Sequence, residues 1–170
     1  MDITKYTGYF HDGSLLEIDA RGNHIILSLE SAEIDPMEIG NVKVLSKSNT
    51  LFGKLHLKNV KEVRVNQKPH ASALYKTYDD GEILDLEVHP GEIFLLIQWT
   101  NFPPKPKTTD VSRIEIQAEE IYWENRLSDT SKREKNDEYL DAYNNPTRRG
   151  AITHVFTRKN DENIGNSTSS

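Results

Sequence analysis

The sequence predicts a mainly β protein, either an antiparallel β-sandwich or a strongly curved sheet, with one or two short helices and a polar C-terminal tail. Two observations carry this prediction. Apolar and ionised side chains alternate with a period of two along several segments, and short turn signals rich in glycine, proline and asparagine join neighbouring segments. The 170 residues suffice for a buried core, although the hydrophobic content of 35% is low for one.

The first expected hairpin follows a turn-like start at residues 10–14 and reverses at Gly22-Asn23. Glycine in the first position of a two-residue turn favours type II′. The implied register places six side chains on one apolar face, in the pairs Leu16 with Leu29, Ile18 with Leu27 and Ala20 with Ile25. The opposite face then carries Glu17, Asp19, Ser28 and Glu30 and is exposed to solvent.

The middle of the chain predicts a loop at residues 31–50, interrupted by a short strand near residues 42–45. Alternation resumes at residues 51–57 and continues to Val65 after a bulge expected at Asn59. Residues 70–78 fit a short helix or an ordered loop equally well.

A second hairpin is expected to join residues 83–88 to residues 93–99 through Pro90-Gly91, a pair that favours a type II turn. The run from Ile93 to Ile97 is apolar at every position. Such a run predicts a central strand that is covered on both faces.

A stiff loop from Trp99 to Lys107 contains two aromatic residues and three prolines. Because a pre-stiffened segment loses less conformational entropy on docking, this loop is the best candidate for contact with another protein. The residues expected to bind the partner are Trp99, Phe102, Pro103, Pro104 and Lys105. The alternative is a rigid connection in which Trp99 and Phe102 only cap the core.

The last strand of the body is expected at residues 113–124, with a bulge at Glu119-Glu120 where the apolar phase shifts by one residue. Three regions are therefore predicted. Residues 1–126 form a β-rich body, residues 127–157 hold a peripheral helix and an edge strand, and residues 158–170 form a disordered tail.

Composition excludes several classes of protein. The chain has no cysteine, so a disulfide framework, a thiolate zinc site and a cysteine nucleophile are absent. Neither a signal peptide nor an apolar run of about 20 residues is present, which predicts a cytoplasmic protein without membrane contact. Residues 1–125 hold 20 acidic and 13 basic side chains, which argues against nucleic acid and favours a basic protein partner.

The motifs predict neither catalytic residues nor a metal or cofactor. The doublet His11-Asp12 resembles a metal-binding pair, but no companion ligands follow at suitable spacing. Instead, Phe10, His11, Asp12 and Gly13 are expected to form a structural turn before the first strand. The six histidines include no helical i, i+4 pair, and neither GxSxG nor a phosphate-binding glycine loop occurs.

Two alternatives to a binding protein remain open. The pairs Glu17 with Asp19 and Asp85 with Glu87 each lie about 7 Å apart on a strand, as in an inverting glycan hydrolase. A solvated sheet face is the preferred explanation of both pairs, because charged residues are mostly found at the surface. A small-ligand carrier would need an apolar cavity, for which we predict a lining of Phe94, Leu96 and Trp99.

The order of these segments, from Phe10-His11-Asp12-Gly13 through Gly53 to Leu57 and on to Ile121-Tyr122-Trp123, resembles a group of small uncharacterised bacterial β-proteins. Some members of that group resemble immunity proteins that neutralise secreted toxins. The resemblance covers about residues 9–125 and implies no catalytic role for any of them. The leading hypothesis is therefore a cytoplasmic, cofactor-free protein-binding domain, immunity-like by this resemblance, that occludes a partner protein.

Overall fold

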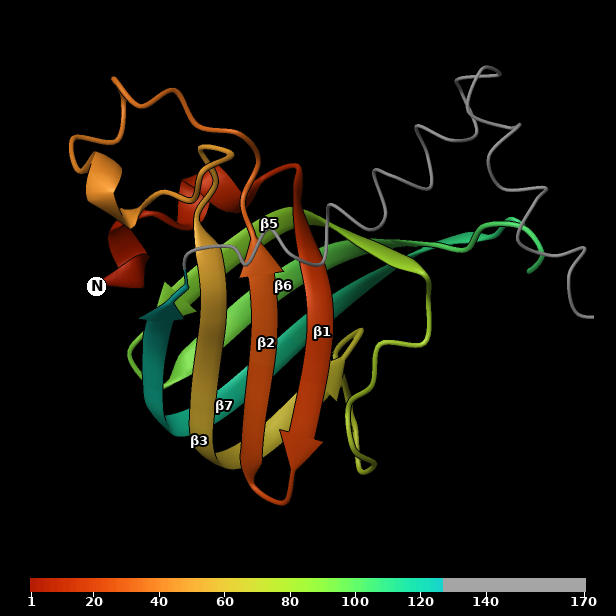
Figure 1. Ribbon diagram of the computed structural model, residues 1–170. Coiled ribbons are helices and arrows are strands. Elements are labelled where there is room, and N and C mark those ends of the chain that lie inside the picture. The colour runs from red at the N-terminus through yellow and green to blue at the C-terminus, as the bar shows by residue number, and fades with distance from the viewer. Residues whose placement is uncertain (127–170) are drawn as a thin grey trace, which may run out of the picture. The chain divides into compact units, whose positions relative to one another are not determined.

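The computed structural model describes residues 1–126, and they form seven β-strands that pair only in antiparallel fashion (Figure 1). The strands are β1 (Gly13–Arg21), β2 (His24–Glu30), β3 (Phe52–Val65), β4 (Lys68–Pro69), β5 (Asp80–His89), β6 (Glu92–Thr100) and β7 (Thr109–Asn125). Three short 3₁₀ helices accompany them, η1 (Ile3–Lys5), η2 (Thr7–Phe10) and η3 (Val42–Val44). The prediction of a mainly β chain is confirmed.

The strands form one strongly curved sheet whose pairings close on themselves. Their order is β2-β1-β5-β6-β7-β3-β4, and an additional pairing joins β2 to β3. The closed circuit therefore runs β1, β2, β3, β7, β6, β5 and back to β1, with β4 attached outside it. Of the two predicted architectures, the curved sheet is the one observed.

The strength of this closure differs greatly around the circuit. Strands β3 and β7 are long, and eleven residue pairs join them. Between β1 and β5 only two pairs form, Gly13 with Ile83 and Ser14 with Glu82. The junction between β1 and β5, which we call the seam, is thus the shortest contact in the circuit.

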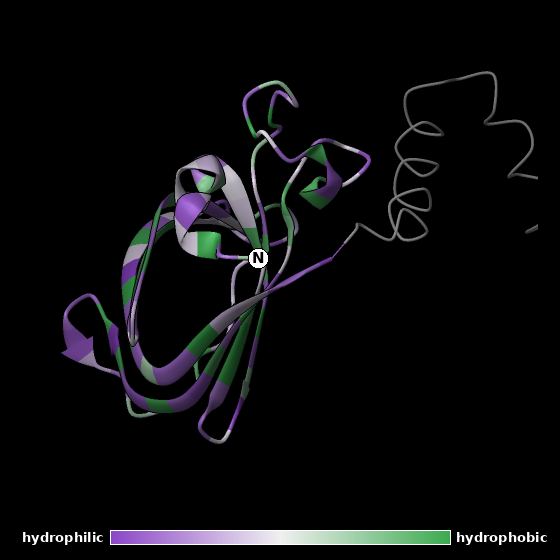
Figure 2. Ribbon diagram, turned by 90° about the vertical axis from the view of Figure 1, so that its left-hand side faces the viewer, coloured by the Kyte–Doolittle hydropathy of each residue, from purple (hydrophilic) through white to green (hydrophobic). Residues whose placement is uncertain are grey.

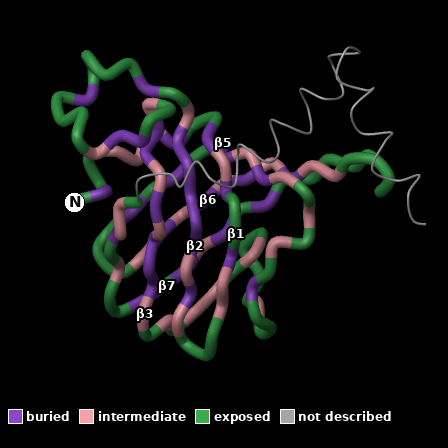
Figure 3. The backbone as a smooth tube through the Cα atoms, in the orientation of Figure 1, coloured by how far each residue is buried: buried purple, intermediate pink, exposed green. Residues whose placement is uncertain are grey.

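The hydrophobic core fills the inside of the circuit because side chains alternate between its two faces. Apolar and polar positions alternate along much of the sheet, and so do buried and exposed ones (Figures 2 and 3), except in the apolar run of β6 and at the buried end of β2. On β6 the inward residues Ile93, Leu95 and Ile97 are buried, whereas Phe94 and Leu96 are only half-buried. The prediction that this strand is covered on both faces is wrong for the described residues, since only its inner face is covered.

The first hairpin has the predicted turn but one unpredicted bulge. Arg21 pairs with His24 around Gly22, whose positive φ of 59° fits the glycine position of a type II′ turn. Ile18 and Ala20 pair as expected, but the register shifts at Leu16, so Leu15 is buried in its place and Leu16 is exposed. An extra residue in one strand reverses the face of everything beyond it.

The second hairpin repeats this pattern. His89 pairs with Glu92, and Gly91 has a φ of 81°, as a type II turn requires. The register shifts between Ile83 and Asp85, so Ile83 is buried while Leu84 is only half-buried.

The loop between β2 and β3 contributes its own buried residues. The expected strand near residues 42–45 is instead the 3₁₀ helix η3, because Val44 and Leu45 donate to carbonyls only three residues back. The loop also covers Glu30, which was expected on the solvent side but is 6% exposed. Its carboxylate accepts a hydrogen bond from the Thr50 hydroxyl at 3.0 Å.

Strands β3 and β7 bend together, which explains the shift of apolar phase in both. Asn59 adopts a left-handed conformation with a φ of 52°, and on either side of it Leu57 pairs with Ile121 and Val60 with Ala118. The phase shift expected in β7 at Glu119-Glu120 is present, but the register shift between the two strands falls between Val60 and Glu62 of β3. The predicted bulge in β7 is therefore a bend shared by both strands, followed by a bulge in β3.

Residues 70–78 form an ordered loop in place of a helix. Within residues 1–126, no helix is long and apolar enough to cross a membrane. The peripheral helix and edge strand predicted at residues 127–157, and the tail predicted at residues 158–170, lie outside the described residues.

Candidate functional site

The segment Phe10-His11-Asp12-Gly13 lies at the seam. Phe10 is 0% exposed, and its ring meets that of Trp123 edge to face at 5.6 Å. The Asp12 backbone N–H donates to the carbonyl of Ile83 at 2.9 Å. A Cβ on Gly13 would overlap the carbonyl oxygen of Glu30, so β1 enters the sheet where only glycine fits.

His11 occupies an exposed position at the bulge of β5. Its Nδ1 lies 2.6 Å from the carbonyl oxygen of Leu84, the bulged residue, to which it can donate. The carbonyl of Leu16, the bulged residue of β1, likewise accepts a hydrogen bond from Lys76 Nζ at 3.3 Å. Each bulge disrupts the ladder of backbone hydrogen bonds and leaves one carbonyl without a regular partner. In both cases a side chain donates a hydrogen bond to that carbonyl.

The proline loop between β6 and β7 is anchored at one carboxylate. Asp79 accepts hydrogen bonds from the Lys105 ammonium at 2.5 Å and from the Phe102 backbone N–H at 2.9 Å. These two donors hold the pKa of Asp79 below its ordinary value. Pro103 and Pro104, joined by a cis peptide bond, lie between the anchored residues.

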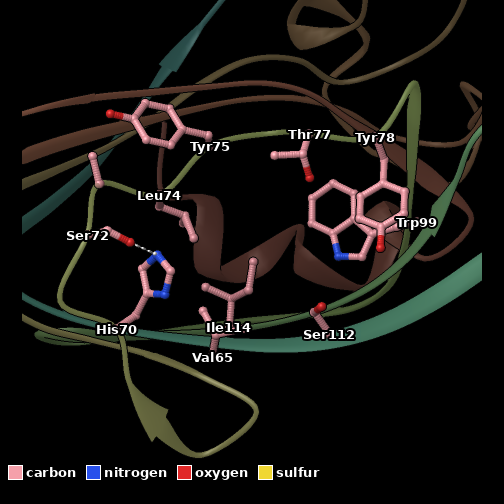
Figure 4. Close-up of a pocket in the computed structure, with 11 residues that line it drawn as sticks. Val65, His70, Ser72, Leu74, Tyr75, Thr77, Tyr78, Trp99, Ser112 and Ile114 are labelled. Atoms are coloured by element: carbon pink, nitrogen blue, oxygen red, sulfur yellow. Dashed lines mark hydrogen bonds between the residues drawn. The ribbon is translucent and has the colours of Figure 1, made fainter.

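The two aromatic residues of the proposed binding loop differ in their exposure to solvent. Phe102 is 48% exposed, so it does not cap the core. Trp99 is 5% exposed and stacks on Tyr78 with ring centroids 5.7 Å apart. Of the loop's aromatics only Phe102 is available to a partner protein, while Trp99 lines a pocket at one end of the circuit (Figure 4).

A different surface combines exposed apolar and charged side chains on the outer side of β5, β6 and β7. We call acidic face the outward side chains that surround the apolar pair Phe94 and Leu96. These are five carboxylates and one guanidinium: Glu82, Asp85, Glu87, Glu92, Glu115 and Arg113.

The register fixes the arrangement on this face. Leu96 lies between Asp85 on β5 and Arg113 on β7, and Phe94 lies between Glu87 and Glu115. The Arg113 guanidinium sits 5.3 Å from the centre of the Phe94 ring and 2.7 Å from a Glu115 oxygen. A shallow depression of about 120 Å³ runs over Phe94 and Leu96.

The carboxylate pairs that would serve a glycan hydrolase all point outward. Glu17 and Asp19 lie on the outer face of β1, where Asp19 pairs with Arg21 at 2.8 Å, and Asp85 and Glu87 belong to the acidic face. The depression beside Asp85 and Glu87 is well below the size of an ordinary ligand cleft. This arrangement gives the hydrolase alternative no support.

Sequence spacing could not reveal a histidine cluster on the outer face of β2, β3 and β7. His56 Nδ1 lies 3.4 Å from His24 Nε2, and His56 Nε2 lies 2.9 Å from a Glu124 oxygen. The Tyr122 ring stacks on His56 at 4.6 Å. Burial lowers the pKa of His24, and the neighbouring His56 and Lys58 lower it further.

This cluster does not form a metal site. His24 and Glu124 contact different nitrogens of the His56 ring, so the three groups do not converge on one point. Over residues 1–126, no three histidine or carboxylate side chains are placed to hold a metal ion.

Besides the histidine cluster, the sequence did not predict the central apolar pair of the acidic face or the lining of the end pocket. The unbroken apolar run of β6 was a signal for the central pair Phe94 and Leu96, but it was interpreted as burial on both faces. The carrier lining predicted from Phe94, Leu96 and Trp99 is wrong, because the first two face outward and only Trp99 lines the end pocket. The other aromatic side chains of that pocket are Tyr75 and Tyr78.

Comparison with protein-family models, with curated proteins and with solved structures found no match.

Proposed function

We propose that this chain is a non-catalytic protein-binding domain that uses its acidic face to occlude a basic partner protein. The observation that carries the proposal is the pair Phe94 and Leu96, half-buried at the centre of a ring of carboxylates. An apolar centre inside a polar rim is the usual organisation of a protein interface.

Strand β6 supports this proposal because it is apolar on both faces. Its inner residues fill the core, whereas none of residues 1–126 fully covers Phe94 or Leu96 on the outer side. A partner that covered this pair would remove apolar surface from water, which favours association.

Charge supports a basic partner. Five carboxylates face outward here against one guanidinium, and residues 1–125 as a whole carry seven more acidic than basic side chains. Complementary charge would steer a basic domain to this face and raise its rate of association at low salt. A cytoplasmic location and an immunity-like role belong to the same proposal, and a toxin encoded immediately upstream would be the first partner to test.

The proposal is tested by capturing partners from the native host with the full chain and with two charge-reversed variants. Asp85→Lys with Glu87→Lys alters the acidic face, and Glu33→Lys with Glu38→Lys makes the same change of charge on exposed positions of the loop between β2 and β3. We expect the first variant to bind the captured partner at least about tenfold more weakly and the second to bind it normally.

Two results would count against this function. One is equal loss of binding in both variants, which would mean that net charge alone attracts the partner. The other is failure of the unaltered chain to retain any stable partner at low salt.

A further inference from the structure

One end of the strand circuit contains a pocket that is separate from the acidic face. Residues 70–78 cross this end, and between them and the strands lies a space of about 260 Å³ (Figure 4). Its walls include Leu74, Tyr75 and Tyr78 from the loop and Trp99 and Ile114 from β6 and β7. None of the residues that define the acidic face lines it.

Two buried polar groups in this pocket have no partner among residues 1–126. The Ser112 side chain belongs to a residue that is 9% exposed, and its hydroxyl makes no hydrogen bond within the described part of the chain. The same holds for the indole N–H of Trp99, which is 5% exposed. Buried tryptophan N–H groups and buried hydroxyls nearly always find a partner, so both groups call for one.

The register places these two groups together. Trp99 pairs with Asp110, and Ser112 lies two residues further along β7, so Trp99 and Ser112 are diagonal neighbours on the inner face. Figure 4 shows the indole nitrogen on the side of its ring that faces Ser112. One ligand atom between them could accept a hydrogen bond from the indole and exchange another with the hydroxyl.

The lining restricts the chemistry of such a ligand. Its side chains are aromatic, aliphatic, hydroxyl-bearing or imidazole, and it contains no lysine, arginine, aspartate or glutamate. An ionised ligand would therefore lose its hydration without gaining a charged partner. The volume lies just below the range of about 300–1,000 Å³ that holds drug-sized molecules, so the space suits a single ring.

We propose that the end pocket binds a small neutral molecule with one apolar ring and an oxygen acceptor, the acceptor lying between the Trp99 indole N–H and the Ser112 hydroxyl. This binding activity is independent of the proposed protein interface. The proposed site differs from the one predicted for a small-ligand carrier. It lies at the end of the circuit, and the loop at residues 70–78 supplies aromatic walls.

Benzamide is a suitable probe because it is neutral, has one ring and carries a carbonyl acceptor. The full chain contains two tryptophans, so a ¹⁵N correlation spectrum shows two indole signals, and Trp99→Phe identifies that of Trp99. We expect benzamide at millimolar concentration to shift the Trp99 signal saturably and to leave the Trp123 signal in place. Toluene, which lacks the acceptor, is expected to bind at least several-fold more weakly.

Matched variants locate the binding. Ala73 is exposed and lines the pocket, whereas the neighbouring Ala71 is exposed and does not. Ala73→Phe fills the space and should abolish the shift, while Ala71→Phe should preserve it. Ser112→Ala should weaken benzamide binding about two- to tenfold.

The proposal is overturned if the Trp99 signal does not move up to the solubility limit of benzamide, since the two polar groups would then bind only water. It is also overturned if Ala73→Phe, with a well-dispersed spectrum, leaves the shift unchanged. Neither result would alter the outcome of the charge-reversal experiment on the acidic face.

Discussion

Phe10 joins the N-terminal 3₁₀ helices to the core, because its fully buried ring packs edge to face on Trp123. Truncation to alanine removes that contact and leaves a cavity, so Phe10→Ala should lower the free energy of unfolding by about 3–5 kcal/mol. Urea unfolding followed by circular dichroism measures the change. Phe102→Ala removes the same atoms from a side chain that is 48% exposed and should cost less than about 1 kcal/mol. Equal losses would show that Phe10 is not part of the core.

His24 should make stability depend on pH, because its neighbours lower its pKa in the folded chain. The unfolded chain then takes up a proton at a higher pH than the folded chain does. The stability that neutral His24 contributes is complete above the unfolded pKa of about 6.5 and is lost as the pH falls through the folded pKa.

We therefore expect the free energy of unfolding to fall between pH 7 and pH 5, and to fall less steeply in His24→Gln. The difference should stay below about 1 kcal/mol because the cluster lies on the outer face. His70→Gln, outside the cluster, is the control. Parallel curves for His24→Gln and the unaltered chain would contradict this assignment.

At the scale of single residues, the sequence predicted correctly which strand positions are apolar. It predicted less well which of these side chains face the core. Ile18 and Ala20 face the core as expected, because alternation and the glycine turn fix them together. Leu16 does not, because β1 holds one extra residue relative to β2 between Leu15 and Glu17, and the alternation along the strand does not mark that position.

At the scale of elements, the bulges of β1 and β5 flank the seam, and each has a side-chain donor. His11→Ala removes the donor to the Leu84 carbonyl and should lower the free energy of unfolding by about 1 kcal/mol. Chemical denaturation measures this loss, and the comparison is His89→Ala, which changes an exposed histidine of β5 that makes no contact with a bulge. An unchanged free energy of unfolding in His11→Ala would mean that water satisfies this carbonyl equally well.

The elements that were predicted correctly have a local signal. Both hairpin turns, the apolar phase of β3 and the apolar run of β6 follow from neighbouring residues. A local signal was not always sufficient, since the strand expected near residues 42–45 is the 3₁₀ helix η3. The acidic face and the histidine cluster do not follow from neighbouring residues, because each is assembled across strands whose pairing is set by the whole fold. The two rings of His24 and His56, for example, are separated by 32 positions in the chain.

At the scale of the whole molecule, the sequence did not predict that the circuit of strands closes. A sandwich and a closed curved sheet share the same alternation along each strand, and they differ only in which strands meet. The decisive contacts join β2 to β3 and β1 to β5, and the second of these rests on two residue pairs. So short a ladder becomes favourable only once the rest of the circuit has brought its strands together.

The seam should therefore be the place where the circuit opens first. Native-state hydrogen exchange should give the Asp12 amide, which donates to Ile83 across the seam, a lower opening free energy than the amides of Leu55 and Leu57 in β3. Gly13→Ala should widen this difference, because the added methyl overlaps backbone oxygens at the start of β1, whereas Gly8→Ala meets nothing within 4 Å. If Asp12 instead exchanges only by global unfolding, together with Leu55 and Leu57, the two pairs of the seam close the circuit as firmly as the eleven that join β3 to β7.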